Sequence, residues 1–112
     1  FDVRFLPNPH WETALRPLTG RDPAVVRWLA GQTEVSAYEA ELIATLQRWQ
    51  PRLEASSRAY LTAAIGCTGG QHRSVFLVER LAQALAPHFG QVLLAHRELQ
   101  TFGQGGTVGS AP

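Results

Sequence analysis

The chain has no lysine and only one cysteine among its 112 residues. Without lysine it lacks the residue that a Walker A loop uses to bind nucleotide phosphates, so that type of nucleotide site is excluded. A single cysteine cannot form a disulfide within the chain, and we expect a reducing cytoplasm as the protein's location. No apolar run approaches the roughly 20 residues needed to span a bilayer, so no membrane span is predicted.

The composition is typical of one small globular domain. Hydrophobic residues make up 45% of the chain and charged residues 17%, which suits a buried core with a polar surface. The formal net charge is +1, with all ten basic residues being arginine. Dedicated nucleic-acid binders usually carry a strong basic patch, so the overall charge does not by itself predict such a partner.

Short apolar runs rich in strand-forming residues predict three strands, at residues 2–6, 59–66 and 91–95. Strands that alternate with helices favour parallel pairing through right-handed crossovers. We therefore expect an α/β fold: a single small layered domain with a mainly parallel sheet and flanking helices, over residues 1–100. Residues 101–112 are rich in glycine and carry no charge, and they are expected to form a flexible tail.

Three helices are expected from capping residues and periodicity. Asp22-Pro23 is typical of a helix start, with aspartate as the N-cap and proline at the first position. A second helix is expected to open at Ser36, where Glu39 would complete a capping box. Pro51 is expected to kink or interrupt that helix. The third helix is expected over residues 73–86.

The most informative segment is a glycine-rich stretch, residues 67–74, which joins the second predicted strand to the third predicted helix. Loop amides before a helix N-terminus form an anion site, because the helix dipole favours negative charge there. Glycines let the backbone come close to a phosphate. Arg73 adds a planar guanidinium suited to phosphate oxygens. The segment therefore predicts a binding site for a phosphate-type ligand.

Three loops are expected to meet at this site, since ligands of open parallel sheets lie beyond the carboxyl ends of the strands. Arg4 and Arg16 are accessory candidates from the first loop and its surroundings, and His96 and Arg97 from the third. The predicted ligand-binding residues are Asn8, His10, Cys67, Thr68, Gly69, Gly70, Gln71, His72, Arg73 and Ser74.

Three strings in this order resemble the C-terminal domain of the RapZ/YvcJ family of bacterial nucleotide-binding and RNA-adapter proteins. They are Asp2-Val-Arg-Phe-Leu-Pro-Asn-Pro-His-Trp11, Leu15-Arg-Pro-Leu-Thr-Gly20 and Ile65-Gly-Cys-Thr-Gly-Gly-Gln-His-Arg-Ser-Val75, and His96-Arg97 follows them. The resemblance runs through roughly the first hundred residues. The family's nucleotide-hydrolysing P-loop domain has no counterpart in this chain.

The resemblance implies a sensing module for a phosphorylated small molecule, an amino-sugar phosphate such as glucosamine-6-phosphate. It implies that His10 and the loop from Cys67 to Arg73 form the ligand pocket. It also implies RNA as an alternative partner. The arginines spread along the helices form either a patch for that RNA or solvated helix faces; they are Arg48, Arg52, Arg58 and Arg80. Family members assemble as oligomers, so the helical stripe of Leu42, Ile43, Leu46 and Trp49 is either core or an oligomer face.

A second alternative is enzymatic. Five residues separate Cys67 from Arg73, which is the spacing of cysteine-dependent phosphatases, and a thiolate at a helix start is activated. However, Gly66 stands where those enzymes have a histidine, and no acid loop is recognisable. The simpler roles for Cys67 are support of an anion-binding loop or packing alone, and no catalytic activity is expected.

The spacing of the histidines does not match a metal-binding motif. His10, His72 and His96 are far apart in the sequence, and the one cysteine belongs to the loop. We therefore expect neither a metal nor a cofactor.

Overall fold

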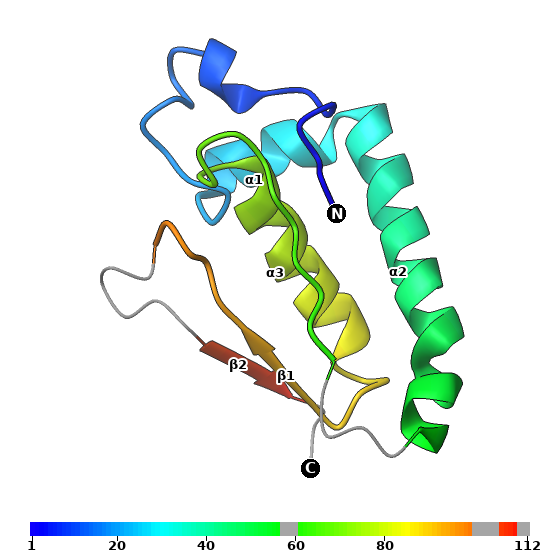
Figure 1. Ribbon diagram of the computed structural model, residues 1–112. Coiled ribbons are helices and arrows are strands. Elements are labelled where there is room, and N and C mark those ends of the chain that lie inside the picture. Colours follow the sequence, from blue (N-terminus) through cyan, green and yellow to red (C-terminus); the bar gives the residue numbers. More distant parts are fainter. Residues whose placement is uncertain (57–60, 100–105, 110–112) are drawn as a thin grey trace.

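The computed structural model describes residues 1–56 and 61–99 with their side chains, and the backbone of residues 106–109. Within these residues the chain forms a compact small domain with three α-helices (Figure 1). Its elements, in chain order, are the 3₁₀ helix η1 (Pro9–Trp11), α1 (Pro23–Ala30), α2 (Thr33–Ala55), α3 (Arg73–Leu85), β1 (Gln91–Leu94) and β2 (Gly106–Gly109).

Helix α3 occupies the centre of the domain. Figure 1 shows α2 alongside it and the β1–β2 pair on its other side. Its apolar positions recur at helical spacing, so one face is buried along the whole helix. The core cluster at its N-terminal end comprises Val3, Leu6, Leu15, Val25, Leu29, Val35, Phe76 and Leu77, and that at its C-terminal half comprises Leu42, Leu81 and Leu85.

The predicted first and third helices are confirmed. Asp22 is the N-cap of α1 with Pro23 at its first position, although the Asp22 carboxylate accepts the amide of Thr19 rather than one of α1. Helix α3 spans Arg73–Leu85, close to the expected 73–86.

The predicted start of α2 at Ser36 is wrong. The helix begins at Thr33 after the N-cap Gln32. Ser36 donates its hydroxyl to Ala30 O, and Glu39 pairs with Arg80 of α3 instead of closing a capping box. Pro51 does not interrupt α2, which continues to Ala55. Because Pro51 has no N–H, α2 lacks the hydrogen bond that would reach Gln47 O, and four more residues of the helix follow the proline.

The helical stripe on α2 is partly core. Leu42 is buried, and Ile43 and Leu46 pack against its cluster. Trp49 is 47% exposed and lies under the guanidinium of Arg52, 4.8 Å from the ring centroid. The Trp49 ring is therefore outside the core, and the stripe ends in a solvent-facing aromatic side chain.

A mainly parallel sheet is not confirmed by the described residues. The strand expected at 2–6 becomes a turn after one parallel bridge, Asp2 to Gly66. The Asp2 carboxylate captures the amide of Arg4 at 3.0 Å, and Leu6 N donates to Val3 O. Local side-chain bonds of this kind compete with strand pairing.

Part of the second predicted strand, residues 59–60, lies outside the described residues, and residues 61–65 form no ladder. The third predicted strand is present as β1. It pairs antiparallel with β2, from Gln91 opposite Gly109 to Leu94 opposite Gly106. Strand β2 falls within the expected tail, whose other residues lie outside the described part of the chain. No described helix is both long and apolar enough to cross a membrane.

Candidate functional site

The glycine-rich loop (residues 67–74) leads directly into α3, as the sequence predicts. Gly69 and Gly70 both have a positive φ, 78° and 62°, which glycine adopts without steric cost. Within the described residues, no backbone amide from Thr68 to Arg73 donates a hydrogen bond. A run of unpaired amides before a helix is the geometry that binds an anion.

Cys67 and Ser74 close this loop across its base. The Ser74 amide donates to Cys67 Sγ at 3.3 Å, and the thiol lies 3.3 Å from Ser74 Oγ. The sulfur therefore accepts one of the first-turn amides of α3 that has no helical partner. This contact gives Cys67 a structural role in holding the loop against the helix.

Arg73 is buried, with 3% of its surface exposed. Its Nη1 donates to Arg4 O at 2.7 Å and to Leu6 O at 2.9 Å, so the side chain anchors the first loop to α3. Its buried Nε has no hydrogen-bond partner, and no carboxylate among the described residues pairs with it. A buried cation without a counter-charge is costly, and an anionic ligand would reduce that cost.

Gln71 and His72 fasten the glycine-rich loop to residues 15–20. Gln71 Nε2 donates to Arg16 O and Leu18 O at 2.8 and 2.6 Å. The buried His72 ring places Nε2 3.1 Å from Leu15 O. The side chains of these two predicted ligand residues are thus bonded to protein, which leaves their backbone amides for an anion.

His10 lies on η1 and Asn8 is the N-cap of η1, and Arg16 connects η1 to Gln71 of the glycine-rich loop. Asn8 Oδ1 caps η1 by accepting the His10 amide at 3.0 Å, and Arg16 Nε donates to His10 O at 2.8 Å. The His10 ring is exposed and lies edge-to-face against Trp11, with centroids 5.7 Å apart. The Arg16 side chain is therefore bonded to the backbone of η1. The His10 imidazole makes no hydrogen bond among the described residues and is open to a ligand.

The loop after β1 reaches the glycine-rich loop through Glu98, which sequence reasoning did not single out. A β-carbon on Gly70 would lie 2.8 Å from Glu98 Cγ. His96 is buried on the α3 side, where its Nε2 lies 3.2 Å from Glu79 Oε1, an oxygen that Arg21 also contacts. The His96 side chain is thus bonded to α3 and does not point to the glycine-rich loop as a free ligand group. The one feature of the sequence that could have indicated Glu98 as a site residue is that it directly follows the candidate residues His96 and Arg97.

Arg4 is exposed and forms a close ion pair with Asp2, at 2.7 Å between Nη2 and Oδ2. The hydrogen bonds from the Arg4 side chain, and next the one from its backbone amide, lower the pKa of Asp2 from 3.8 to about 2. The side-chain hydrogen bond with Asp2, and next the negative charge of that carboxylate, raise the pKa of Arg4. Its guanidinium is therefore directed at Asp2, while its carbonyl is directed at Arg73.

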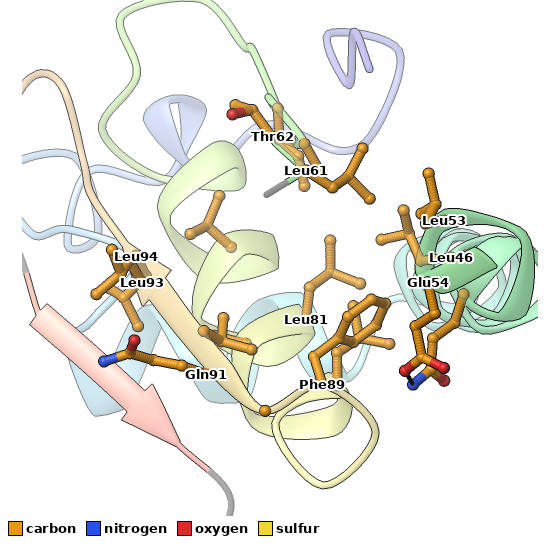
Figure 2. A pocket seen from close by; sticks show the side chains of 18 residues that line it. Leu46, Leu53, Glu54, Leu61, Thr62, Leu81, Phe89, Gln91, Leu93 and Leu94 are labelled. Atoms are coloured by element: carbon orange, nitrogen blue, oxygen red, sulfur yellow. Dashed lines mark hydrogen bonds between the residues drawn. The ribbon is translucent and has the colours of Figure 1, made fainter. Parts of the chain in front are cut away.

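A cavity lined by described residues lies apart from this site. It has a volume of about 660 Å³ and lies between the end of α2, residues 61–65, α3 and β1 (Figure 2). Its walls are mainly apolar, and none of them belongs to the glycine-rich loop. In the described part of the chain, no three His, Cys, Asp or Glu side chains cluster as a metal site would require.

The arginines considered for RNA contact differ in their partners among the described residues. Arg80 pairs with Glu39 and lies over the Phe76 ring. Arg48 and Arg52 are exposed on α2, and Arg58 lies outside the described residues. RNA binding therefore stays a prediction from resemblance alone.

Comparison with known proteins identifies relatives that match most of this chain. The sequence model of the RapZ C-terminal domain matches residues 1–100. A protein named as nucleotide-binding from Cupriavidus taiwanensis is 54% identical over 103 residues, which are 92% of this chain and 35% of that protein. Similarly named proteins from Ralstonia nicotianae and Shewanella baltica are each 54% identical over 99 residues, covering 88% of this chain and 33% and 35% of theirs.

The present chain thus spans about a third of the length of the curated relatives it matches. The matched region contains η1, all three described helices and the glycine-rich loop with its supporting residues. The chain therefore belongs to the RapZ C-terminal domain family.

Proposed function

We propose that this domain binds a phosphorylated small molecule, an amino-sugar phosphate such as glucosamine-6-phosphate, at the start of α3. The observation that carries the proposal is Arg73, a buried cation with an unpartnered Nε and no carboxylate beside it. The unpaired amides of the glycine-rich loop adjoin it in sequence. The phosphate would rest on these amides, and His10 would contact the sugar.

The relatives are named nucleotide-binding proteins, and nucleotides belong to the broader class of phosphorylated ligands, which supports this class of ligand. Binding without turnover fits the site better than catalysis. A phosphatase would also need a general acid for the leaving group, and the sequence has no recognisable acid loop. The function is therefore that of a sensor or binding module, and the phosphatase alternative has no further support.

Calorimetry with glucosamine-6-phosphate, glucose-6-phosphate and inorganic phosphate tests this function. We expect saturable binding of the amino-sugar phosphate by the wild-type protein. The variant Arg73→Met keeps an apolar stem but removes the charge, and it should weaken binding by about ten- to a hundredfold.

The matched control is Arg27→Met, since Arg27 is exposed on α1 and its side chain makes no hydrogen bond or ion pair within the described residues. Circular dichroism checks that both variants fold, because Arg73 also holds Arg4 O and Leu6 O. Absence of saturable binding of all three compounds to folded wild-type protein would refute the proposal. If both variants lost the same amount of ligand affinity, Arg73 would not be a ligand-binding residue.

A further inference from the structure

One carboxylate oxygen in the middle of α3 holds two distant segments of the chain. Glu79 Oε1 accepts a hydrogen bond from Arg21 Nε at 2.7 Å and lies 3.2 Å from His96 Nε2. Arg21 belongs to the segment just before α1, 58 residues from Glu79, and His96 belongs to the loop after β1, 17 residues away. Both segments are therefore fastened to α3 at the same atom.

These contacts are partly shielded from solvent. The His96 side chain is 2% exposed, and the side chains of Glu79 and Arg21 are 23% and 39% exposed. Hydrogen bonds to an ionised acceptor are stronger than those between neutral groups, and partly buried charges are screened less by salt. The Glu79 carboxylate therefore holds its partners more firmly than a fully exposed ion pair would.

The segment before α1 touches the glycine-rich loop directly. Gly20, which precedes Arg21, donates its amide to Gln71 O at 2.9 Å. Gln71 in turn donates its side-chain amide to two carbonyls of the same segment. The bond between Arg21 and Glu79 therefore ties to α3 the segment against which Gln71 is held.

The loop after β1 touches the glycine-rich loop as well. Glu98 Cγ would lie 2.8 Å from a β-carbon placed on Gly70. The turn that carries Glu98 is closed by the Leu99 amide, which donates to His96 O at 3.0 Å. The contact between His96 and Glu79 therefore ties this turn to α3, together with the side chain that packs beside Gly70.

We propose that Glu79 is a positioning residue for the glycine-rich loop. Its carboxylate fixes both neighbouring segments on α3 at once, and these segments keep Gly70 and Gln71 in one arrangement. If the segments are released, only a fraction of the molecules has the arranged loop, and the apparent ligand affinity falls by that fraction. The effect on affinity rests on the proposed function, whereas the effect on the loop is a property of the free protein.

A graded series of substitutions tests this role in the free protein. Glu79→Gln keeps an acceptor oxygen without the charge, and Glu79→Met keeps the length of the side chain without any acceptor. Hydrogen exchange of the Gly20 and Leu99 amides, followed by NMR, should become about threefold faster in Glu79→Gln and about tenfold faster in Glu79→Met.

The matched control is Glu39→Met, because Glu39 pairs with Arg80 between α2 and α3 and its side chain is 16% exposed. This control removes a comparable ion pair that holds neither segment, so exchange of both amides should stay within about twofold of the wild type. Circular dichroism checks that all three variants fold.

Calorimetry with glucosamine-6-phosphate supplies the second readout. Affinity should fall about threefold in Glu79→Gln and about tenfold in Glu79→Met, and it should stay within about twofold of the wild type in Glu39→Met. The positioning role is overturned if exchange of the two amides is unchanged in Glu79→Met, or if Glu39→Met accelerates it equally. It is also overturned if exchange accelerates while the affinity of Glu79→Met equals that of the wild type.

The two readouts separate this inference from the proposed function. If exchange accelerates in the expected order but no folded protein binds the compound, the proposed function fails. In that case the role of Glu79 in holding the glycine-rich loop stands, because the exchange measurement uses the protein without ligand.

Discussion

Gly20→Ala provides a direct test of how the first loop meets α3. Gly20 is buried, and its amide donates to Gln71 O at 2.9 Å. A β-carbon there would lie 2.3 Å from His72 O and 2.4 Å from Phe76 N, which are the two atoms of a hydrogen bond in the first turn of α3. Both atoms belong to the backbone, so a rotamer change cannot relieve the clash.

The expected loss of stability follows from these contacts. Overpacking of a close-packed site costs about 1–3 kcal/mol, and weakening one backbone hydrogen bond adds about 0.5–1.5 kcal/mol. The reduced entropy of the unfolded chain offsets about 0.4–1 kcal/mol. The net effect is a loss of about 0.5–4 kcal/mol with a central value of about 2 kcal/mol, and this central value lowers the midpoint of thermal unfolding by roughly 8–16 °C in a domain of this size.

Thermal unfolding followed by circular dichroism measures this effect, with Gly31→Ala as the matched control. A β-carbon on Gly31 would meet its nearest neighbour, Arg27 O, at an ordinary 3.4 Å, so its stability should change by less than about 0.5 kcal/mol. Gly20→Ala should also weaken phosphate-ligand binding, because the glycine-rich loop must shift with the first turn of α3. A midpoint for Gly20→Ala within about 2 °C of the control would refute the close approach.

Two further predictions concern Cys67 and the Asp2–Arg4 pair. Serine at position 67 keeps an acceptor for the Ser74 amide, so Cys67→Ser should reduce ligand affinity by less than about tenfold. Cys67→Val removes the acceptor and should reduce ligand affinity more. Equal losses of affinity in calorimetry would contradict this role of Cys67. Asp2 has a folded-state pKa of about 2, below its usual 3.8, so its stabilising contribution is present above about pH 4 and is lost as pH falls toward 2. Denaturant unfolding across this range should show a shallower pH dependence for Asp2→Asn than for the wild type, and identical profiles would exclude the ion pair as a source of stability.

Several local features were predictable from the sequence because short-range chemistry specifies them. Asp22 and Pro23 mark the start of α1, and apolar periodicity marks α3 and β1. The two adjacent glycines at 69 and 70 indicate a loop with unusual backbone angles, which the positive φ values confirm. The three strings that resemble the RapZ family indicate that family from the sequence alone, and the match over residues 1–100 confirms it.

Only the tertiary structure decided what the polar side chains of the site do. Arg73 bonds carbonyls 69 and 67 residues away, and Gln71 bonds carbonyls 55 and 53 residues away. Periodicity and capping rules describe neighbours within a few residues, so they cannot reveal that these side chains are used to fasten one loop to another. The same holds for Glu98, whose position beside Gly70 depends on the anchoring of His96 on α3. The sequence by itself thus determined the family and the loop's backbone character, while packing across the domain determined which groups are left for a ligand, because that depends on contacts between segments far apart in the chain.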